Sequence, residues 1–330
     1  MPAAGTRRGG VLVKALVTGA AGFIGSTLAT ALVDRGAEVV GIDCFTDYYA
    51  REIKESNLAA LRERSSYRFV DARLQDVDFG PLLDGVTHVF HLAAQAGVRG
   101  SWGDQFLSYT SNNVDATQRL LEALKGHPLT RLVYASSSSV YGDVATIPMQ
   151  ETAYLQPLSP YGVTKLAAEH LCHLYCVNHG VPTVSLRYFT VYGPRQRPDM
   201  GFHRFIRAAL TGEPITLFGD GEQTRDFTFV DDIVAATIAA GERGRPGGIY
   251  NIGGGSRVTI NQVLAMIARV TGRPLDIRRL PAEKGDMRDT FADSSRAQAD
   301  LGFSPSHSLE DGLKAECQWL AALLGRPLTA

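Results

Sequence analysis

The sequence contains little cysteine and no excess of charge of either sign. Its four cysteines are too few and too scattered along 330 residues for a disulfide framework, which favours a reducing, cytoplasmic setting. Its 33 Lys and Arg residues are balanced by 34 Asp and Glu residues, giving a formal net charge of −1. The sequence therefore has no excess of basic residues that would indicate nucleic acid or an anionic membrane as a partner. Internal repeats and low-complexity tracts are also missing.

The composition is that of a globular protein of one large or two ordinary domains, since 45% of the residues are apolar and 20% are charged. Residues 15–33 carry no charge and follow several basic residues, which superficially resembles a membrane span. Glycines interrupt this run, and its pattern changes at Gly19 from strand-like to helix-like. We therefore expect no membrane segment. Residues 1–10 are expected to form a mobile tail.

The first half of the chain alternates apolar strand patterns with helical ones. Strands are expected at 11–18, 38–43, 67–71, 88–92, 131–136 and 183–187, and helices are expected to begin near Gly22, Gln105 and Pro160. The helix from Gln105 is expected to run to about Lys125. Such alternation predicts βαβ units and hence an α/β fold with a doubly wound parallel sheet of Rossmann type.

After about Tyr188 the segments become shorter and richer in glycine, proline and arginine. We predict a Rossmann domain over 11–188, to which a segment at about 223–252 returns, and a smaller C-terminal lobe formed mainly by 189–330. Within this lobe, helices are expected at 202–211, 230–241 and 260–271. A strand at 223–230 is expected to run back toward the sheet.

Three glycines follow the first expected strand at three-residue spacing: Gly19, Gly22 and Gly25. Gly19 allows a tight turn, Gly22 lets the backbone approach a pyrophosphate, and Gly25 permits close packing of helix on sheet. The helix that follows, with Phe23 and Ile24 at its start, presents its N-terminus to negative charge. In this strand–turn–helix context the pattern predicts a dinucleotide site that includes all five residues.

Residues at the ends of the next strands complete the expected cofactor site. Asp43 can accept hydrogen bonds from both ribose hydroxyls of adenosine and would repel a 2′-phosphate, which favours NAD over NADP. The alternative for Asp43 is an ordinary turn residue. Asp71 is placed to reach the adenine amino group. Leu92, Ala93 and Ala94 end the fourth strand, where small side chains let a dinucleotide lie across the sheet edge.

Tyr161 and Lys165 are four residues apart at the start of a helix and so share one face. A phenol has a pKa of about 10, and a neighbouring ammonium would lower it toward the range of a useful base. Four consecutive serines, 136–139, end an upstream strand at the edge where ligands of such folds bind. A serine hydroxyl there can share a proton with Tyr161 and a substrate oxygen. The alternatives are an ordinary amphipathic helix and a serine-rich loop.

Together these motifs resemble the extended short-chain dehydrogenase/reductases, and among them the nucleotide-sugar epimerases and dehydratases. The resemblance covers about 13–303 and is carried by TGAAGFIG, HLAA, YASSSSVYG, SPYGVTK, LRYFTVYGP, GDGEQTRDFTFVDDI and GDMRDTFAD. It implies that Ser137, Tyr161 and Lys165 are catalytic, the last two also contacting NAD. It adds three residues to the cofactor site: Asn113, Tyr188 and Val191.

Three positions distinguish the reactions of this family. Its 4,6-dehydratases carry Asp-Glu where this sequence has Ser137 and Ser138, and its uronate decarboxylases typically carry Glu at Ser139. The resemblance therefore implies 4-epimerisation of a UDP-sugar. Segments 43–58 and 188–200 are most similar to UDP-glucuronate 4-epimerases, although Cys44 replaces a common Asn. A UDP-glucose 4-epimerase, which usually carries Asn at Thr190, is the alternative, and a UDP-glucuronate decarboxylase is a more distant one.

The resemblance also implies a mechanism. The Tyr161 phenolate, aided by Ser137, takes the C4 hydroxyl proton while the C4 hydride passes to NAD⁺. The 4-keto sugar rotates, and hydride returns to its other face, so that NAD is recycled internally. For a uronate, this β-keto acid loses CO₂ unless its carboxylate is restrained. Thr190, Ser138 and Arg197 are the expected anchors, Arg197 because a guanidinium fork matches a carboxylate; a solvated arginine or a diphosphate contact is the alternative for Arg197.

The UDP portion of the substrate requires cations and a stacking surface. The resemblance implies that Arg225 and Arg288 contact the diphosphate and ribose, that Phe218 flanks uracil, and that Arg99 points into the cleft. Each arginine could instead form an ordinary surface ion pair. The helices beginning near Gln105 and Pro160 resemble the pair that forms a four-helix homodimer interface in this family.

Other interpretations of the sequence are weaker. His170, Cys172, His173 and Cys176 are close in sequence, but no second ligand pair at zinc-like spacing accompanies them, so no metal site is expected. A non-catalytic NAD-binding regulator is a rival that the retained serine, tyrosine and lysine argue against. A net reductase is another rival.

Overall fold

The computed structural model describes residues 13–143, 146–281, 287–326 and 328. The tail expected at 1–10 and the beginning of the first expected strand lie outside this range, as does part of the GDMRDTFAD motif. Within the described residues, none of the helices combines the length and the apolar character that crossing a membrane requires.

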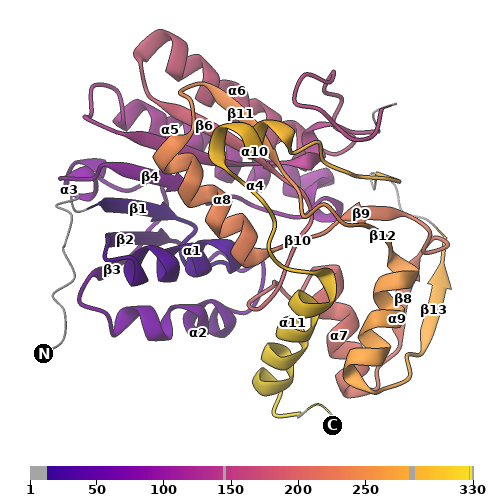
Figure 1. Ribbon diagram of the computed structural model, residues 1–330. Coiled ribbons are helices and arrows are strands. Elements are labelled where there is room, and N and C mark those ends of the chain that lie inside the picture. The colour runs from indigo at the N-terminus through magenta and orange to yellow at the C-terminus, as the bar shows by residue number, and fades with distance from the viewer. Residues whose placement is uncertain (1–12, 144–145, 282–286, 327, 329–330) are drawn as a thin grey trace, which may run out of the picture.

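Seven parallel strands form the central sheet, in the order β11-β6-β5-β4-β1-β2-β3 (Figure 1). They are β1 (Lys14–Thr18), β2 (Glu38–Asp43), β3 (Tyr67–Asp71), β4 (His88–His91), β5 (Arg131–Ser137), β6 (Thr183–Tyr188) and β11 (Gly248–Ile252). The predicted Rossmann-type sheet is confirmed. The strand order reverses between β1 and β4, and connections leaving in opposite directions open a crevice at the carboxyl ends of these strands.

Helices cover both faces of the sheet. One face carries α1 (Phe23–Asp34), α2 (Arg51–Arg62) and α8 (Val230–Arg243), and the other carries α3 (Phe79–Leu83), α5 (Ala116–Ala123) and α6 (Pro160–His179). Because side chains alternate along a strand, β1 contributes to both apolar layers. Ala15 and Val17 belong to the core on the α1 and α8 side, whereas Leu16 belongs to the core on the α5 and α6 side.

The helix expected from Gln105 to about Lys125 is present as a continuous helical run from Phe106 to Ala123, but a π-helical turn divides it. Three short elements, η1 (Arg99–Ser101), η2 (Gly103–Gln105) and α4 (Phe106–Tyr109), precede a π-helical turn, η3 (Thr110–Asp115), and α5 follows. Within the π turn, Asn113 accepts a hydrogen bond from the Gln95 backbone N–H at 2.7 Å and donates to Thr164 Oγ1 at 2.9 Å. A π turn inserts one extra residue, and this insertion accompanies the inward direction of the Asn113 side chain.

Helix α6 begins at Pro160, as expected, and extends to His179. Ser159 caps its N-terminus by accepting a hydrogen bond from the Gly162 N–H, Pro160 occupies the first turn, and Gly180 ends the helix in the left-handed conformation. The cap fixes the start of the helix, and with it the positions of Tyr161 and Lys165 beside the end of β5.

The second lobe lies at the lower right of Figure 1. Helices α7 (Gly201–Thr211), α9 (Ile260–Thr271) and α11 (Leu309–Leu323) pack together there, next to the pair β8 (Ile215–Phe218) and β13 (Ile277–Leu280). Helix α10 (Ser295–Leu301) packs instead on α8 and β11. The division of the chain near residue 188 stays a prediction.

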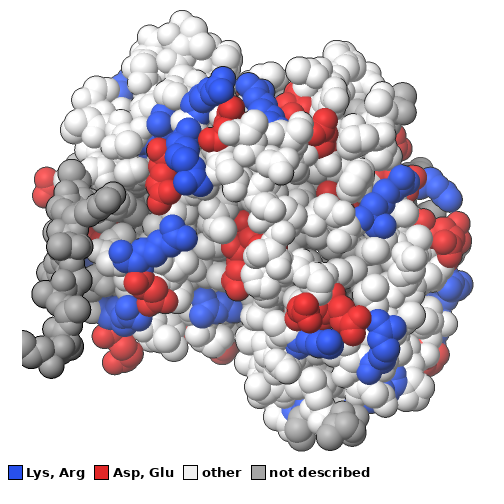
Figure 2. Space-filling view, in the orientation of Figure 1, with Lys and Arg blue, Asp and Glu red and all other residues white. Residues whose placement is uncertain are grey.

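The strand expected at 223–230 is present but does not reach the main sheet. It splits into β9 (Thr224–Asp226), which pairs with β12 (Arg257–Thr259), and β10 (Thr228–Phe229), which pairs with β7 (Val191–Tyr192). Strand β11 joins the sheet instead, beside β6. On the face shown in Figure 2, acidic and basic side chains are interspersed, as the near-zero net charge leads one to expect.

Candidate active site

A cleft that is partly open to solvent lies at the carboxyl ends of β1 and β4. Twelve of the predicted cofactor residues line it: Gly19, Gly22, Phe23, Ile24, Gly25, Asp43, Leu92, Ala93, Ala94, Tyr161, Lys165 and Tyr188. Residues from the β2–α2 segment line it as well, namely Cys44, Thr46, Tyr48, Tyr49 and Lys54. The cleft therefore combines the crevice of the doubly wound sheet with the start of α6.

The glycine turn fits a diphosphate. Gly19 has φ of 71°, and a Cβ there would lie 2.8 Å from the backbone nitrogen of Ala93. A Cβ on Gly25 would collide with the Gly19 carbonyl oxygen. Helix α1 starts at Gly22 with no side-chain cap, so the backbone N–H groups of its first turn are left to a ligand.

Asp43 is held so that it can still accept hydrogen bonds. Its carboxylate accepts from the Ala21 N–H at 3.1 Å and from the Phe45 N–H at 3.0 Å. A carboxylate has about four lone-pair sites, so roughly two remain for a ribose diol. Burial raises the pKa of Asp43, while its backbone hydrogen bonds and the charge of Lys54 act in the opposite direction.

Three predicted cofactor residues do not line the cleft. Asp71 pairs with Arg51 at 2.9 Å on the surface, and Ala72 lines the cleft beyond it. Asn113 lies buried behind the cleft, where it joins the segment after β4 to α6 through the hydrogen bonds described above. Val191 is buried in β7, and its carbonyl accepts a hydrogen bond from Gln196. Each of these three residues therefore contacts other residues of the chain instead of lining the cleft.

Ser137 and Tyr161 are brought together. Their hydroxyls are hydrogen-bonded, and Ser137 Oγ also accepts from the Ser139 N–H at 3.1 Å. Lys165 is 3% exposed, and its Nζ lies 4.4 Å from the centroid of the Tyr134 ring, a cation–π contact. The arrangement places a phenol and an amine in the lining of the cleft, with a serine hydroxyl next to the phenol.

The electrostatics of this group differ from the expectation. Burial raises the pKa of Tyr161, and the charge of Arg197 and the hydrogen bond from Ser137 lower it. Burial lowers the pKa of Lys165 to about 7, so the amine is only partly charged at neutral pH. In the free protein the positive charge that acts on Tyr161 is therefore that of Arg197, and not that of Lys165 as the sequence led us to expect.

A second cavity is lined by residues close in sequence to Ser137 and Tyr161, among them Ser138, Ser139 and Ser159. Three predicted substrate residues, Ser138, Thr190 and Arg225, line it. The other lining residues are Val98, Ser139, Leu158, Ser159, Met287 and Thr290. Hydroxyl groups and one guanidinium thus surround this cavity, which suits a polyhydroxylated, anionic ligand.

Arg197 lines the first cleft together with Tyr161. Its Nε and Nη2 donate to the two carboxylate oxygens of Asp199, each at 3.0 Å. Tyr48 also donates to Asp199, at 3.2 Å. Sequence reasoning missed Tyr48 and Asp199, because no spacing rule connects two residues that are 151 positions apart.

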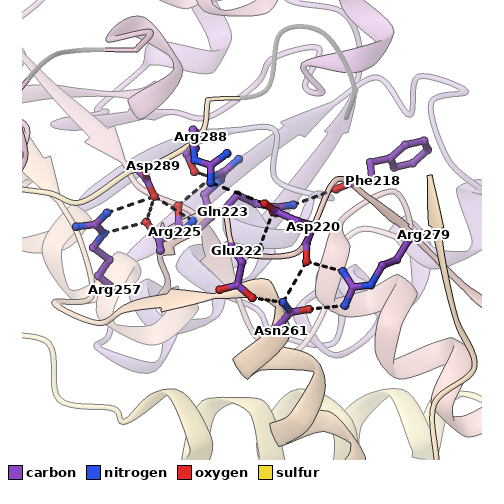
Figure 3. Close-up of polar contacts among 11 residues, drawn as sticks. Phe218, Asp220, Glu222, Gln223, Arg225, Arg257, Asn261, Arg279, Arg288 and Asp289 are labelled. Atoms are coloured by element: carbon purple, nitrogen blue, oxygen red, sulfur yellow. Dashed lines mark hydrogen bonds and ion pairs between the residues drawn. The ribbon is translucent and has the colours of Figure 1, made fainter. Parts of the chain in front are cut away.

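Two of the remaining predicted substrate residues, Phe218 and Arg288, lie in a polar cluster together with Arg225 (Figure 3). The Arg99 guanidinium carbon lies 4.5 Å from the centroid of the Phe218 ring, and Arg225 Nη1 donates to the Arg288 carbonyl at 2.9 Å. Arg288 itself lies 3.8 Å from Asp220 in an exposed ion pair. Arg99, Phe218 and Arg288 line neither cavity.

Two further arginines in this cluster were missed by the sequence analysis. Arg257 pairs with Asp289 at 3.3 Å, and Arg279 Nη2 donates to Asn261 at 3.0 Å (Figure 3). Neither stands in a motif, and their only signal was the general richness of this lobe in arginine. Among the residues that the structure describes, no group of three or more His, Cys, Asp and Glu side chains is placed to hold a metal ion.

Comparison with known proteins identifies relatives over nearly the full chain. Residues 15–253 match the family described as the NAD dependent epimerase/dehydratase family. A Bacillus subtilis (strain 168) protein named "Uncharacterized UDP-glucose epimerase YtcB" is 45% identical over 315 residues, covering 94% of this chain and 99% of that protein. The UDP-glucuronate 4-epimerase of Thermodesulfobacterium geofontis (strain OPF15) is 38% identical over 312 residues, covering 92% of this chain and 95% of that protein.

A solved structure is also similar over the same range. The UDP-glucuronic acid 4-epimerase from Bacillus cereus, in complex with UDP-glucuronic acid and NAD, has a TM-score of 0.92 to this chain. It is 45% identical, and the match covers 94% of this chain and 100% of that one.

Proposed function

This chain belongs to the NAD dependent epimerase/dehydratase family, and we propose that it is an NAD-dependent 4-epimerase that converts UDP-glucuronate to UDP-galacturonate. The observation that carries the proposal is that Arg197 and Tyr161 line the same cleft, close enough for the charge of Arg197 to lower the pKa of the phenol. A carboxylate-binding group therefore lies beside the candidate base. Two of the relatives named above, from Thermodesulfobacterium geofontis and Bacillus cereus, are named for this substrate.

The cofactor would occupy the glycine-lined cleft. Gly19, Gly22 and Gly25 shape the cradle for its diphosphate, and Asp43 has free lone pairs for the adenosine ribose. When bound, NAD supplies reversible acceptance and return of hydride. Lys165 and Tyr188 line the end of the cleft beside Tyr161, so we assign them to the nicotinamide end.

The residues of the chain itself transfer a proton and restrain the carboxylate of the substrate. Tyr161 takes the proton of the sugar C4 hydroxyl and later returns it, and Ser137, already hydrogen-bonded to it, shares that proton. Because burial raises the pKa of Tyr161 in the free protein, the phenolate needs added positive charge. Arg197 provides part of it, and bound NAD⁺ provides more.

The sugar and its UDP group are assigned to the second cavity and the lobe beyond it. Arg197, which lines the first cleft, and Ser138 and Thr190, which line the second cavity, restrain the uronate carboxylate. This restraint suppresses loss of CO₂ from the 4-keto sugar. Arg225 also lines the second cavity and suits the diphosphate. Arg99, Phe218 and Arg288 are proposed for the uridine end, where they require side-chain movement because they line neither cavity.

Incubation of the purified protein with UDP-glucuronate tests the proposal, with products separated against UDP-galacturonate and UDP-xylose standards. UDP-galacturonate without net formation of NADH is the expected result. A UDP-pentose as the main product would mean that the carboxylate is not restrained. An inert UDP-glucuronate alongside turnover of UDP-glucose would transfer the assignment to the neutral sugar.

A UDP-glucose 4-epimerase is the second candidate because of one feature of the site. The Nε–Nη2 edge of Arg197 is already bound by Asp199, so part of its capacity for a carboxylate is used within the protein. The Bacillus subtilis relative is named for UDP-glucose. Comparing kcat/KM for UDP-glucuronate and UDP-glucose on one preparation discriminates between the two.

We also propose a homodimer built on α4 and α6. Val163, Leu174 and Val177 are at least half exposed along one face of α6, and Leu107 on α4 is 76% exposed. Apolar side chains in such a row favour burial against a second copy. Sedimentation equilibrium should give twice the chain mass, and Leu174→Asp should shift the distribution toward the monomer.

The four free cysteines are compatible with a cytoplasmic location.

A further inference from the structure

The ion pair between Arg197 and Asp199 uses one defined edge of the guanidinium. Nε and Nη2 each donate to a different oxygen of Asp199 at 3.0 Å, which is the bidentate geometry of a strong arginine–carboxylate pair. Nη1 makes no hydrogen bond with any residue in the described part of the chain. The Nη1 side of the fork, in a residue that lines the cleft with Tyr161, is therefore left for a ligand.

Asp199 is itself held by a residue from another segment of the chain, Tyr48. The Tyr48 hydroxyl donates to Asp199 Oδ2 at 3.2 Å, and the Arg197 guanidinium carbon lies 6.0 Å from the centroid of the Tyr48 ring. Tyr48 belongs to the segment that follows β2, whereas Arg197 and Asp199 belong to the segment between β7 and α7. The carboxylate therefore fixes the arginine relative to both halves of the molecule.

An arginine without such a partner would be poorly placed for its task. Its side chain has several rotatable bonds, and ordering them on binding reduces affinity. Four phenols surround the pair closely enough to interact with Arg197, those of Tyr48, Tyr49, Tyr109 and Tyr161. A guanidinium that is 21% exposed among these rings needs a counter-charge in the free protein.

We propose that Asp199 is a positioning and specificity-determining residue, which holds the Nε–Nη2 edge of Arg197 so that the Nη1 edge meets the carboxylate of a uronate substrate. This inference rests on the proposed function. Asp199 does not touch the sugar in this arrangement and acts only through Arg197. The opposite role, in which Asp199 competes with the substrate for the same edge, is disfavoured because Tyr48 anchors Asp199 independently of Arg197.

The experiment measures kcat and KM for UDP-glucuronate and UDP-glucose with Asp199→Ala, Asp199→Asn and Asp199→Glu. The Asp199→Ala variant should lower the uronate-to-glucose ratio of kcat/KM at least about tenfold, mainly through KM for UDP-glucuronate, and should increase the yield of UDP-pentose. Asp199→Asn keeps one acceptor and should show a smaller loss, and Asp199→Glu should restore part of the ratio. Tyr48→Phe removes only the hydroxyl and should lower the ratio in the same direction.

The matched control is Glu213→Gln, which breaks an exposed ion pair with Arg207 in the same lobe. It should leave the ratio unchanged. A ratio that changes less than twofold in Asp199→Ala overturns the positioning role. A ratio that rises also overturns it, because it would show that Asp199 competes with the substrate. Wild-type protein that does not turn over UDP-glucuronate defeats the proposed function instead, so the two failures are distinguishable.

Discussion

At the scale of single residues, burial acts in opposite directions on Tyr161 and Lys165. It raises the pKa of the phenol and lowers that of the amine to about 7. The free protein therefore holds a protonated tyrosine next to a lysine that is about half charged at neutral pH. The proposed role of Tyr161 as a base depends on positive charge from elsewhere in the cleft, and the charge of Arg197 lowers its pKa.

Replacing Tyr161 by Phe removes the only proposed acid–base group at the sugar C4 hydroxyl. We expect kcat to fall by about 10²–10⁴-fold, the usual contribution of a positioned acid–base residue. Bound NAD should be retained, because the ring is kept. Turnover assays combined with the absorbance of the bound dinucleotide check both parts. Tyr154→Phe, at a side chain that is 79% exposed, is the control and should retain full activity.

Lys165→Met should stabilise the protein in a pH-dependent manner. The lysine has a pKa of about 7 in the folded protein and of about 10.4 when unfolded, so the unfolded state binds more protons between these values. The destabilisation by Lys165 is therefore complete below pH 7 and is relieved as the pH rises toward 10.4. We expect the variant to gain a few kcal/mol in free energy of unfolding at pH 6 and much less at pH 10.

Denaturant unfolding at a series of pH values measures this gain. Lys314→Met, at an exposed lysine, should show no such trend. A gain that is the same at pH 6 and pH 10 would contradict the depressed lysine pKa.

The proposed catalytic residues could be selected from the sequence because each stands in a motif at the end of a strand or the start of a helix. The partners that set their charge could not. Asp71 was expected to contact adenine, but in the structure its carboxylate forms an ion pair with Arg51 on α2. Likewise, the Tyr48–Asp199 contact joins two loops from different halves, and only the folded chain brings them together.

At the scale of elements, the β1–α1 turn depends on close approach of backbone to backbone. A methyl group on Gly25 would collide with the carbonyl oxygen of Gly19, so the helix would have to move away from the strand. We expect Gly25→Ala to weaken NAD binding at least tenfold and to lower Tm, both of which titration calorimetry and thermal unfolding can measure. Gly201→Ala is a comparison for stability, because Gly201 does not have a positive φ and a Cβ there would make only an ordinary contact with the Phe205 ring, at 3.6 Å. Equal NAD affinity in Gly25→Ala and wild type would refute the cradle.

The helical periodicity of 105–125 could not reveal the π turn within it. Periodicity reports which side chains are apolar, whereas the turn accompanies the hydrogen bonds of one polar residue, Asn113, to the Gln95 backbone and to Thr164. For the same reason the strand at 223–230 was predicted but its partners were not. Loops bring β7 and β12 next to this segment. A loop has no periodic sequence pattern, so its path could not be predicted.

At the scale of the whole molecule, a buried polar network links the sheet to the segment that follows the serine-rich turn. Glu169 on α6 binds Arg187 on β6 through two hydrogen bonds, at 2.6 and 3.1 Å, and also accepts from Ser136 at 2.6 Å. Arg187 in turn donates to the Tyr141 hydroxyl, which donates to Asn251 on β11. Glu169 and Arg187 are each only 2% exposed.

Glu169→Gln should destabilise the whole protein, because it leaves the Arg187 charge buried without a full counter-charge. We expect a loss of about 3 kcal/mol in free energy of unfolding. Adding Arg187→Met should recover much of that loss, since the unpaired charge is then removed. Urea unfolding of the two single variants and the double variant measures the coupling. Additive losses would show that the pair is not a unit.

The overall plan of a Rossmann sheet with a smaller lobe was predictable from two features of the sequence. One is the alternation of strands and helices, and the other is the change near Tyr188 to shorter segments that are richer in glycine, proline and arginine. The order in which the chain completes the sheet was not, because β11 enters it only after the chain has passed through α7, β8 and α8.

This late return of β11 has a consequence for the protein as it is synthesised. Strand β6 ends at Tyr188 and its edge partner at Ile252, so roughly 60 residues separate them, or about 3–13 s of translation. During that interval β6, buried at every position in the finished protein, has an open edge on the nascent chain. Pauses by the ribosome after β6 and before β11 would lengthen the exposure of this edge. Chaperones should be needed most during that interval.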